Sequence, residues 1–427
     1  MIYNLHVGGI VMNNKERVLL VGANINDNED FLLSMIELAS LASALDLEVI
    51  DSVSQNVKDI TSSHYIGTGK VNEIKNVVKE EKIDLVIFNN DLSALQLKNL
   101  EDNLNVRVID RTMLILEIFA RRARSKEAKI QVELASLEYM RPKLIGSNLN
   151  LDRQRGGSKN KGVGEKFLEL DKRKIDYQIN ALKKELIEIE KQKELTSKLR
   201  NASRIPKVAL VGYTNAGKSS LMNCLLNLYG EKEDKLVFEK DMLFATLDTS
   251  SRKINAFGKS FILSDTVGFV SSLPHHLVKA FKSTLDEVKN ADVLLHVIDM
   301  TSPNYLREKK VTEETLNEIL NGEEKKTINV YSKFDLPTSN IIELEDNEVF
   351  VSSKDNEGID ALVSMILDYA FANLIKCCML IPYEYSNVVF ELNKNSFINV
   401  KEEKDEGYYI EVECSEIDYK KYNKFVI

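Results

Sequence analysis

The stretch Val208-Ala209-Leu210-Val211-Gly212-Tyr213-Thr214-Asn215-Ala216-Gly217-Lys218-Ser219 decides the fold of this chain. Its last eight residues fit the phosphate-loop pattern GxxxxGKS at every fixed position, and the apolar run before them is typical of a buried strand. Residues 220–228 are expected to form the helix that follows. Strand, glycine-rich turn and helix in this order predict a P-loop domain, an α/β fold with a mostly parallel sheet and helices on both faces.

The turn also predicts binding of a nucleoside triphosphate. Its glycines let backbone N–H groups point inward at phosphate oxygens. Lys218 is expected to reach the β and γ phosphates as a catalytic group, and the Ser219 hydroxyl to ligate Mg²⁺. The alternative is a turn that binds no nucleotide. Such a turn would carry the required residue at every fixed position of GxxxxGKS only rarely by chance.

A DxxG motif indicates a GTPase. Asp265-Thr266-Val267-Gly268 follows a predicted strand at 260–264. Ligands bind at the carboxyl ends of strands in open α/β sheets, so we expect this motif at the nucleotide. Asp265 would join the Mg²⁺ shell, and the Gly268 N–H would contact the γ-phosphate during catalysis.

Guanine selectivity is predicted from Ser332-Lys333-Phe334-Asp335, which stands after the predicted strand 328–331 where GTPases carry NKxD. Asp335 can accept from the N1 and N2 hydrogens of guanine, a pair that adenine lacks. Leaving that carboxylate unpaired would cost about 1.5 to 3 kcal/mol, which disfavours ATP. Ser332 replaces the usual asparagine with a shorter hydroxyl, so we expect the guanine preference to survive in a weaker form.

Ser352-Ser353-Lys354 follows the predicted strand 348–351 and is expected to close over the guanine through backbone N–H groups and the Lys354 stem. A plain loop is an equally good interpretation of these residues taken alone.

A first switch is predicted between the P-loop and DxxG. The stretch Leu243-Phe244-Ala245-Thr246-Leu247-Asp248-Thr249 has the position of such a segment. Thr246 is the candidate for a second, catalytic hydroxyl on Mg²⁺, and Thr249 is the alternative. An ordinary strand entry is the simpler interpretation.

Intrinsic hydrolysis is expected to be slow. Ras-type GTPases place a water-orienting glutamine directly after DxxG, whereas this chain has Phe269, whose ring cannot position water. The missing group would then come from a partner or from another part of the chain. His275 and His276 are candidates for this group. The simpler interpretation is that both histidines are exposed residues at a turn around Pro274.

Charge is distributed unevenly along the chain. The whole chain has a net charge of −9, yet residues 121–174 hold 15 Lys and Arg against 7 Asp and Glu. Such asymmetry points to a polyanionic partner, and closely spaced glycines at 146, 156, 157, 162 and 164 would let the backbone adapt to RNA. The candidate RNA-binding residues are Arg141, Lys143, Arg153, Arg155, Lys159, Lys161 and Lys166. A solvated interdomain linker is the alternative.

Helices are predicted on both sides of this loop, at 111–139 and 165–199. The second carries an apolar stripe at helical spacing: Ile175, Ile179, Leu182, Leu186 and Ile189. The first offers a matching face: Leu114, Ile118, Ile130, Leu134 and Leu137. Packed antiparallel, the two helices would form an arm with the basic loop at its tip.

The remaining segments complete a four-domain division. Apolar runs at 17–21, 47–53, 85–88 and 106–109 alternate with helical patterns such as 31–45, which predicts a small α/β domain with a largely parallel sheet. Residues from 378 onward alternate around 388–390, 397–400 and 408–412, as in a second small α/β domain, and its acidic surface favours a protein partner. The predicted domains are 1–110, the arm 111–203 with its loop 141–166, the GTPase domain 204–375, and 376–427.

Composition argues against several classes of protein. The four cysteines (Cys224, Cys377, Cys378 and Cys414) lack the spacing of zinc ligands, and no apolar run approaches the length of a membrane span. Reduced cysteines suit a cytoplasmic protein. We further expect a monomer and no DNA partner. Peripheral association with a membrane stays open.

Besides the P-loop, a set of motifs runs along nearly the whole chain: Tyr65-Ile66-Gly67-Thr68-Gly69-Lys70, Asp110-Arg111-Thr112, Ile118-Phe119-Ala120-Arg121-Arg122-Ala123, Gln131-Val132-Glu133-Leu134-Ala135, Gly164-Glu165, Phe244-Ala245-Thr246-Leu247-Asp248, Asp265-Thr266-Val267-Gly268-Phe269 and Thr284-Leu285. With these motifs the chain resembles the HflX family of ribosome-associated GTPases.

The resemblance implies a Mg²⁺-dependent GTPase that docks on the large ribosomal subunit and its RNA, with the arm directed toward the peptidyl transferase region. It implies splitting or rescue of stalled or idle ribosomes under stress, stimulation of hydrolysis by ribosomes, and in some relatives antibiotic resistance. The chain departs from the family pattern at Ser158-Lys159-Asn160-Lys161, Val163 and Lys166-Phe167. These departures leave the depth of the arm and its main task open.

Two other functions compete with this interpretation. An RNA-remodelling ATPase would use Gly67-Thr68-Gly69-Lys70 as a second nucleotide site, although a turn that begins a helix explains these residues equally well. A regulatory GTP-binding module would act on a protein effector and make no RNA contact.

Overall fold

The computed structural model describes the backbone of residues 15–148, 161–200, 205–230, 244, 250–271, 287–338 and 340–427. The chain forms two compact units. The first contains residues 1–187 with the short segments 241–245 and 271–281, and the second contains 188–240, 246–270 and 282–427. The four-domain division stays a prediction.

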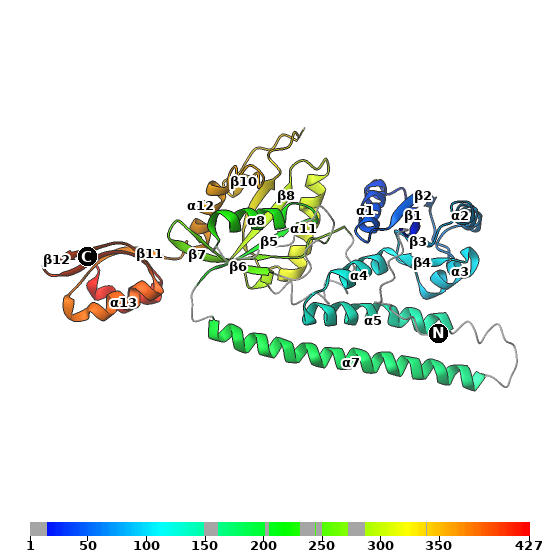
Figure 1. Ribbon diagram of the computed structural model, residues 1–427, viewed down its shortest axis with the longest axis horizontal. Coiled ribbons are helices and arrows are strands. Elements are labelled where there is room, and N and C mark those ends of the chain that lie inside the picture. The colour runs from blue at the N-terminus through cyan, green and yellow to red at the C-terminus, as the bar shows by residue number, and fades with distance from the viewer. Residues whose placement is uncertain are drawn as a thin grey trace. The chain divides into compact units, whose positions relative to one another are not determined.

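The first unit is built on a parallel sheet with the strand order β2-β1-β3-β4 (Figure 1). Its strands are β1 (Arg17–Ile25), β2 (Glu48–Val57), β3 (Leu85–Phe88) and β4 (Arg107–Asp110). The two central strands are apolar and buried on both faces, as parallel strands usually are. Helices α2 (Thr68–Glu80) and α3 (Ala94–Leu104) pack on one face, and α1 (Phe31–Ser43) and α4 (Arg111–Arg122) lie on the other. The predicted small α/β domain is confirmed.

The predicted helix over 111–139 is wrong, because the structure has two helices there. Helix α4 ends at Ala123, whose backbone leaves the helical region (φ −59°, ψ 115°). Helix α5 (Lys126–Asn148) then begins with Ser125 Oγ accepting from the Ala128 N–H at 3.1 Å. Leu114 and Ile118 therefore lie on α4, and only the α5 part of the predicted face is available to the second helix.

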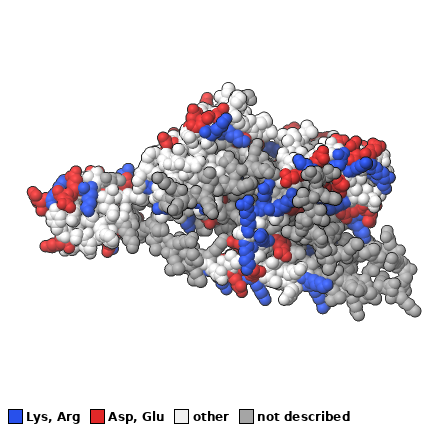
Figure 2. Space-filling model, viewed as in Figure 1, with Lys and Arg blue, Asp and Glu red and all other residues white. Residues whose placement is uncertain are grey.

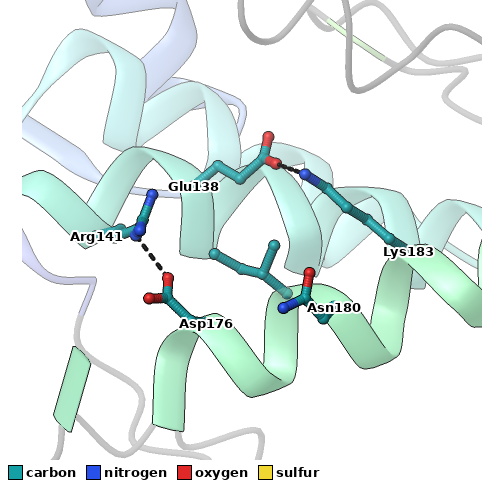
Figure 3. A pocket seen from close by; sticks show the side chains of 6 residues that line it. Glu138, Arg141, Asp176, Asn180 and Lys183 are labelled. Carbon is teal, nitrogen blue, oxygen red and sulfur yellow. Dashed lines mark ion pairs between the residues drawn. The ribbon is translucent and has the colours of Figure 1, made fainter. Parts of the chain in front are cut away.

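That second helix, α7 (Lys161–Arg200), lies antiparallel to α5. Ion pairs join Lys126 to Glu185 at 2.6 Å, Glu138 to Lys183 at 2.7 Å and Arg141 to Asp176 at 2.7 Å. The last two flank a hollow of about 520 Å³ between the helices (Figure 3). The predicted stripe on α7 is confirmed, because Ile179 is buried and the other four members are half-buried.

The loop predicted at 141–166 is helical at both of its ends, which corrects these bounds. Residues 141–148 continue α5 and residues 161–166 begin α7. Local helical continuation from both sides outweighs the glycines there.

The second unit contains a sheet of strand order β10-β9-β8-β5-β7-β6, parallel except for β6, which pairs antiparallel with β7. Its strands are β5 (Lys207–Gly212), β6 (Ser250–Ala256), β7 (Lys259–Asp265), β8 (Val293–Asp299), β9 (Lys326–Ser332) and β10 (Glu348–Phe350). Helices α8 (Lys218–Tyr229) and α12 (Ile359–Ala370) share a core on one face, and α11 (Tyr305–Leu320) packs against β5 and β8. This arrangement confirms the predicted P-loop fold.

The C-terminal part forms a separate antiparallel sheet of order β11-β13-β12, from β11 (Ile375–Ile381), β12 (Phe397–Lys404) and β13 (Gly407–Cys414). Helices α13 (Ser386–Asn395) and α14 (Glu416–Tyr422) follow β11 and β13, and two 3₁₀ turns lie at Tyr383–Tyr385 and Asn423–Phe425. The alternation noted at 388–390 belongs to α13, where Val388, Val389 and Leu392 are buried at helical spacing. Glu402 and Glu403 on β12 are exposed. Both acidic and basic side chains are visible on the surface of this part of the chain (Figure 2).

Candidate functional site

The P-loop joins the carboxyl end of β5 to the start of α8, where Lys218 is buried. The Lys218 ammonium donates to the carbonyl oxygens of Gly212 at 3.0 Å and Tyr213 at 2.6 Å. Burial lowers the pKa of Lys218 to about 8, although the carboxylate of Asp265 opposes this shift. The P-loop thus surrounds the ammonium group of its own lysine with backbone carbonyl oxygens, at the end of a parallel strand.

Two glycines are required by close approaches. Gly212 has φ +149°, and a side chain there would place its Cβ 2.3 Å from the carbonyl oxygen of Val297 on β8. At Gly268 of the DxxG motif, a Cβ would lie 2.8 Å from Thr214 Cα and 3.0 Å from Lys218 Nζ. Gly268 therefore lies directly against the P-loop, which only glycine permits.

Two side-chain oxygen atoms that could bind a metal ion lie close together beside the P-loop. Ser219 Oγ, on the first turn of α8, donates to Asp265 Oδ2 at the end of β7 at 2.8 Å. Next to it, Thr266 Oγ1 donates to the carbonyl of Leu210 at 2.6 Å and ties the two neighbouring strands together. Parallel pairing of β5 with β7 brings these positions to one edge of the sheet.

The residue after DxxG is attached to the P-loop by backbone hydrogen bonds. Phe269 N–H donates to the carbonyl of Gly212 at 3.1 Å, and Thr214 N–H donates to the carbonyl of Phe269 at 2.8 Å. The Phe269 side chain is buried, with 2% of its surface exposed. It is thus a core residue with no polar atom to offer to water.

The NKxD-like segment at the end of β9 is held by several polar contacts. Ser332 Oγ lies 2.6 Å from the carbonyl oxygen of Ala216 in the P-loop and 3.1 Å from that of Ile298. Lys333, with φ +61°, forms an ion pair with Asp299 at 2.6 Å. Phe334 stacks on Phe350 with ring centroids 5.2 Å apart. Sequence reasoning missed Asp299, although its place at the end of β8 was an available signal.

Asp335 and the Ser352-Ser353-Lys354 segment come together. Ser352 is buried, and its hydroxyl donates to Asp335 Oδ1 at 3.0 Å while accepting from the Asp355 N–H at 3.0 Å. Ser353 is half-buried and Lys354 is exposed. The Ser352 hydroxyl orients the carboxylate, a role that the sequence did not indicate.

Comparison with known proteins assigns the family. Three family models match successive parts of the chain: GTP-binding GTPase N-terminal (residues 33–120), GTP-binding GTPase Middle Region (122–200) and 50S ribosome-binding GTPase (207–333). GTPase HflX of Caldanaerobacter subterraneus subsp. tengcongensis is 43% identical over 407 residues, which cover 94% of this chain and 91% of that protein. The chain belongs to the HflX GTPase family.

Other HflX proteins show similar coverage. GTPase HflX of Spirochaeta thermophila is 37% identical over 92% of this chain and 95% of its own length. Among solved structures, a GTP-binding protein of Sulfolobus solfataricus in complex with GDP is 24% identical, with a TM-score of 0.44 over 83% of this chain and 99% of that chain. Membership of the HflX family, shown by the sequence relatives and the family models, makes the chain a GTP hydrolase.

Of the segment predicted to be the first switch of this HflX GTPase, residues 243–249, the structure describes only Phe244. Phe244 is buried, and its ring packs edge-on against Phe119 of α4 with centroids 4.6 Å apart. Ala245, Thr246, Leu247, Asp248 and Thr249, as well as His275 and His276, lie outside the described residues.

The candidate RNA-binding residues differ in their surroundings. Lys143 is buried and forms an ion pair with Asp110, so its ammonium has no access to RNA phosphates, which corrects that candidate. Arg141 pairs with Asp176 on α7 at 2.7 Å. The structure places only the backbone of Lys161 and Lys166, in the first turns of α7. The remaining three candidates, Arg153, Arg155 and Lys159, lie outside the described residues.

Gly67 directly precedes α2, and its N–H donates to Gln55 Oε1 at 3.0 Å. Lys70 pairs with Glu73 on the same helix at 2.8 Å. This arrangement supports the helix start as the simpler interpretation of the Gly67-Lys70 motif. Among the described residues, no helix is apolar and long enough to cross a lipid bilayer.

Proposed function

We propose that this chain binds GTP with Mg²⁺ and uses the bound nucleotide to control docking on the large ribosomal subunit, where it splits or rescues stalled ribosomes. The observation that carries the nucleotide site is the convergence of Lys218, Ser219 and Asp265 at the carboxyl edge of one parallel sheet. The ribosomal part rests on membership of the HflX family and on the match of residues 207–333 to a model described as 50S ribosome-binding GTPase.

The residues present fit a phosphate and a divalent cation. Thr214 Oγ1 is buried and, among the described residues, has no hydrogen-bond partner, so a phosphate oxygen would satisfy it. Ser219 and Asp265 offer the hard oxygen ligands that Mg²⁺ prefers, with Thr246 as a further candidate. Bound Mg²⁺ would supply charge neutralisation between the phosphates.

Each protein group then has a defined task. Lys218 would exchange its two backbone carbonyl partners for phosphate oxygens, and Gly268 would donate its N–H to the γ-phosphate. Asp335, oriented by Ser352, would accept from guanine, and Lys354 would cover the base with its stem. Ser332 would hold the P-loop through the Ala216 carbonyl rather than contact the base.

Slow turnover by the isolated protein is part of the proposal, because buried Phe269 stands where a water-orienting glutamine would be. The ribosome would supply or order the missing group. A monomeric cytoplasmic protein responding to stress suits this role, and displacement of antibiotics that bind near the peptidyl transferase region is a further possible task of the arm.

Sedimentation of ribosomes tests the proposal. Purified protein with a non-hydrolysable GTP analogue should bind intact ribosomes and convert them to subunits, whereas Lys218→Ala should do neither. In parallel, isolated large subunits should raise GTP turnover at least about tenfold, while ATP should not compete. Ribosomes that neither bind the protein nor dissociate would refute the ribosomal role, and failure to bind GTP would refute the nucleotide site.

A further inference from the structure

The carboxyl end of β8 carries an acidic side chain to which the proposed function gives no task. Asp299 is the last residue of β8, and it lies opposite Ser332 in the parallel pairing of β8 with β9. Because the two strands are parallel neighbours, both end at the same edge of the sheet. Asp299 therefore lies beside the segment 332–335, which the proposed function places at the guanine.

The Asp299 carboxylate is held in one orientation by three polar contacts. Its Oδ1 accepts from the Thr301 N–H at 2.9 Å and from the Thr301 hydroxyl at 2.6 Å. Its Oδ2 accepts from the Lys333 ammonium at 2.6 Å. The Asp299 side chain is 14% exposed, so little water competes with these partners. Charge-assisted hydrogen bonds of this kind are stronger than neutral ones.

Lys333 depends on this anchor because its backbone conformation is unfavourable. Its φ is +61°, in the left-handed region that residues other than glycine rarely adopt. The Lys333 carbonyl also accepts from the Leu336 N–H at 3.0 Å, which closes a turn around Asp335. A shift of Lys333 would therefore move the Asp335 carboxylate, the proposed acceptor for guanine.

Ser332 does not replace the anchor. Its hydroxyl has one proton to donate and lies against two backbone carbonyls, those of Ala216 and Ile298. The asparagine that is usual at this position has an amide that donates and accepts at the same time. With serine here, the ion pair between Lys333 and Asp299 is a charged contact that ties the segment 332–335 to β8.

We propose that Asp299 is a positioning residue for guanine recognition. It acts through Lys333 and keeps the turn that carries Asp335 in its base-binding conformation before the nucleotide arrives. The inference rests on the proposed function, in which the segment 332–335 binds guanine. It adds that a residue outside that segment, at the end of a different strand, determines how well the base is bound.

Loss of the anchor should have a distinctive effect on nucleotide binding. GDP and GTP share the guanine base, so both should bind more weakly by the same factor. The reacting phosphate lies at the other end of the nucleotide, so kcat should not change. Hypoxanthine lacks the N2 amino group that Asp335 would bind, so a displaced carboxylate should also reduce the preference for GDP over inosine diphosphate.

The test compares Asp299→Asn with wild type in the full-length chain. This change keeps the shape of the side chain and removes the charge that holds Lys333. Titration measures dissociation constants for GDP, inosine diphosphate and a non-hydrolysable GTP analogue, and GTP turnover gives kcat and KM. We expect affinity for GDP and for the analogue to fall about tenfold. The preference for GDP over inosine diphosphate should fall about threefold, and KM should rise while kcat stays within about twofold.

Lys333→Met tests whether Asp299 acts through the lysine. If it does, adding Asp299→Asn to Lys333→Met should change GDP affinity by less than about twofold, because the partner of the carboxylate is already absent. A tenfold loss in both backgrounds would indicate a general structural defect and would overturn the proposal. Asp368→Asn is the matched control, because Asp368 is exposed on α12, and it should bind all three nucleotides as the wild type does.

Should Asp299→Asn fail to fold, Thr301→Val removes only the hydroxyl that orients the carboxylate, and both affinities should then fall about threefold. Unchanged affinities, or a loss confined to the GTP analogue, overturn the positioning role of Asp299 while leaving the nucleotide site intact. Failure of the wild type to bind GTP overturns both proposals.

Discussion

At the scale of single residues, the depressed pKa of Lys218 predicts how stability depends on pH. Burial lowers this pKa from 10.5 in the unfolded chain to about 8 in the folded protein. Between these pH values the unfolded state holds a proton that the folded state has released, so this group's contribution to stability rises with pH. The ammonium therefore destabilises the unliganded fold fully below about pH 8, and this cost falls as the pH rises from about 8 toward 10.5.

Urea unfolding of the unliganded wild type and of Lys218→Met, from pH 7 to 10, measures the effect. The free energy of unfolding of the wild type minus that of the variant should rise with pH by on the order of 1 to 2 kcal/mol. Subtraction removes the titration of all other groups. Lys354→Met is the matched control, because it makes the same substitution at an exposed position. A difference for Lys218→Met that changes with pH no more than the difference for Lys354→Met would contradict the burial argument.

At the scale of secondary-structure elements, a prediction from the sequence agrees with the structure where the residue pattern itself determines the element. The central strands were predicted because parallel strands buried on both faces are continuous apolar runs. The convergence of Ser219 with Asp265 followed from the same rule, since parallel strands end at one edge. The break between α4 and α5 was missed because it lies between two apolar helical patterns, with neither Gly nor Pro at 123–125 to mark it.

Lys143 shows a second limit of sequence reasoning. A lysine among arginines and glycines predicts a solvated, phosphate-binding group. In the structure its ammonium is instead buried between Asp110, with which it pairs, and the Tyr139 hydroxyl at 2.7 Å. Asp110 is fully buried and also caps α4 through the Met113 N–H at 2.9 Å. Only tertiary packing brings α5 to this carboxylate, 33 residues earlier in the chain.

The buried pair predicts that Lys143 stabilises the docking of α5. Lys143→Met should lower the free energy of unfolding by about 3 kcal/mol, because it leaves the Asp110 carboxylate buried without its cation. The matched control is Lys183→Met, which removes the exposed pair with Glu138 and should cost less than about 0.5 kcal/mol. Equal stability of the two variants, with weakened RNA binding only in Lys143→Met, would instead support the original phosphate-binding interpretation.

At the scale of the whole molecule, charge separates the arm from the rest of the chain. Residues 121–174 carry an excess of eight positive charges in a chain whose net charge is −9. The ion pairs between α5 and α7 neutralise some of them, including Arg141, and Lys143 is buried. The contact with ribosomal RNA should therefore depend on the five remaining candidates, and four of them lie close together in the sequence: Arg153, Arg155, Lys159 and Lys161. The fifth is Lys166.

Substituting these four residues with glutamine should make binding of isolated large subunits weaker and less sensitive to salt. Each lost phosphate contact removes about 0.7 to 0.9 from the slope of log K against log salt concentration, so four contacts would reduce it by roughly 3. Binding with the GTP analogue is measured across a KCl series. The matched control replaces Lys253, Lys310, Lys401 and Lys404, which are exposed in the second unit and change the net charge by the same amount. If the slope of log K against log salt concentration falls equally in both variants, the overall charge of the protein rather than the arm sets the affinity. If the slope is unchanged in the arm variant, a protein effector is favoured over RNA.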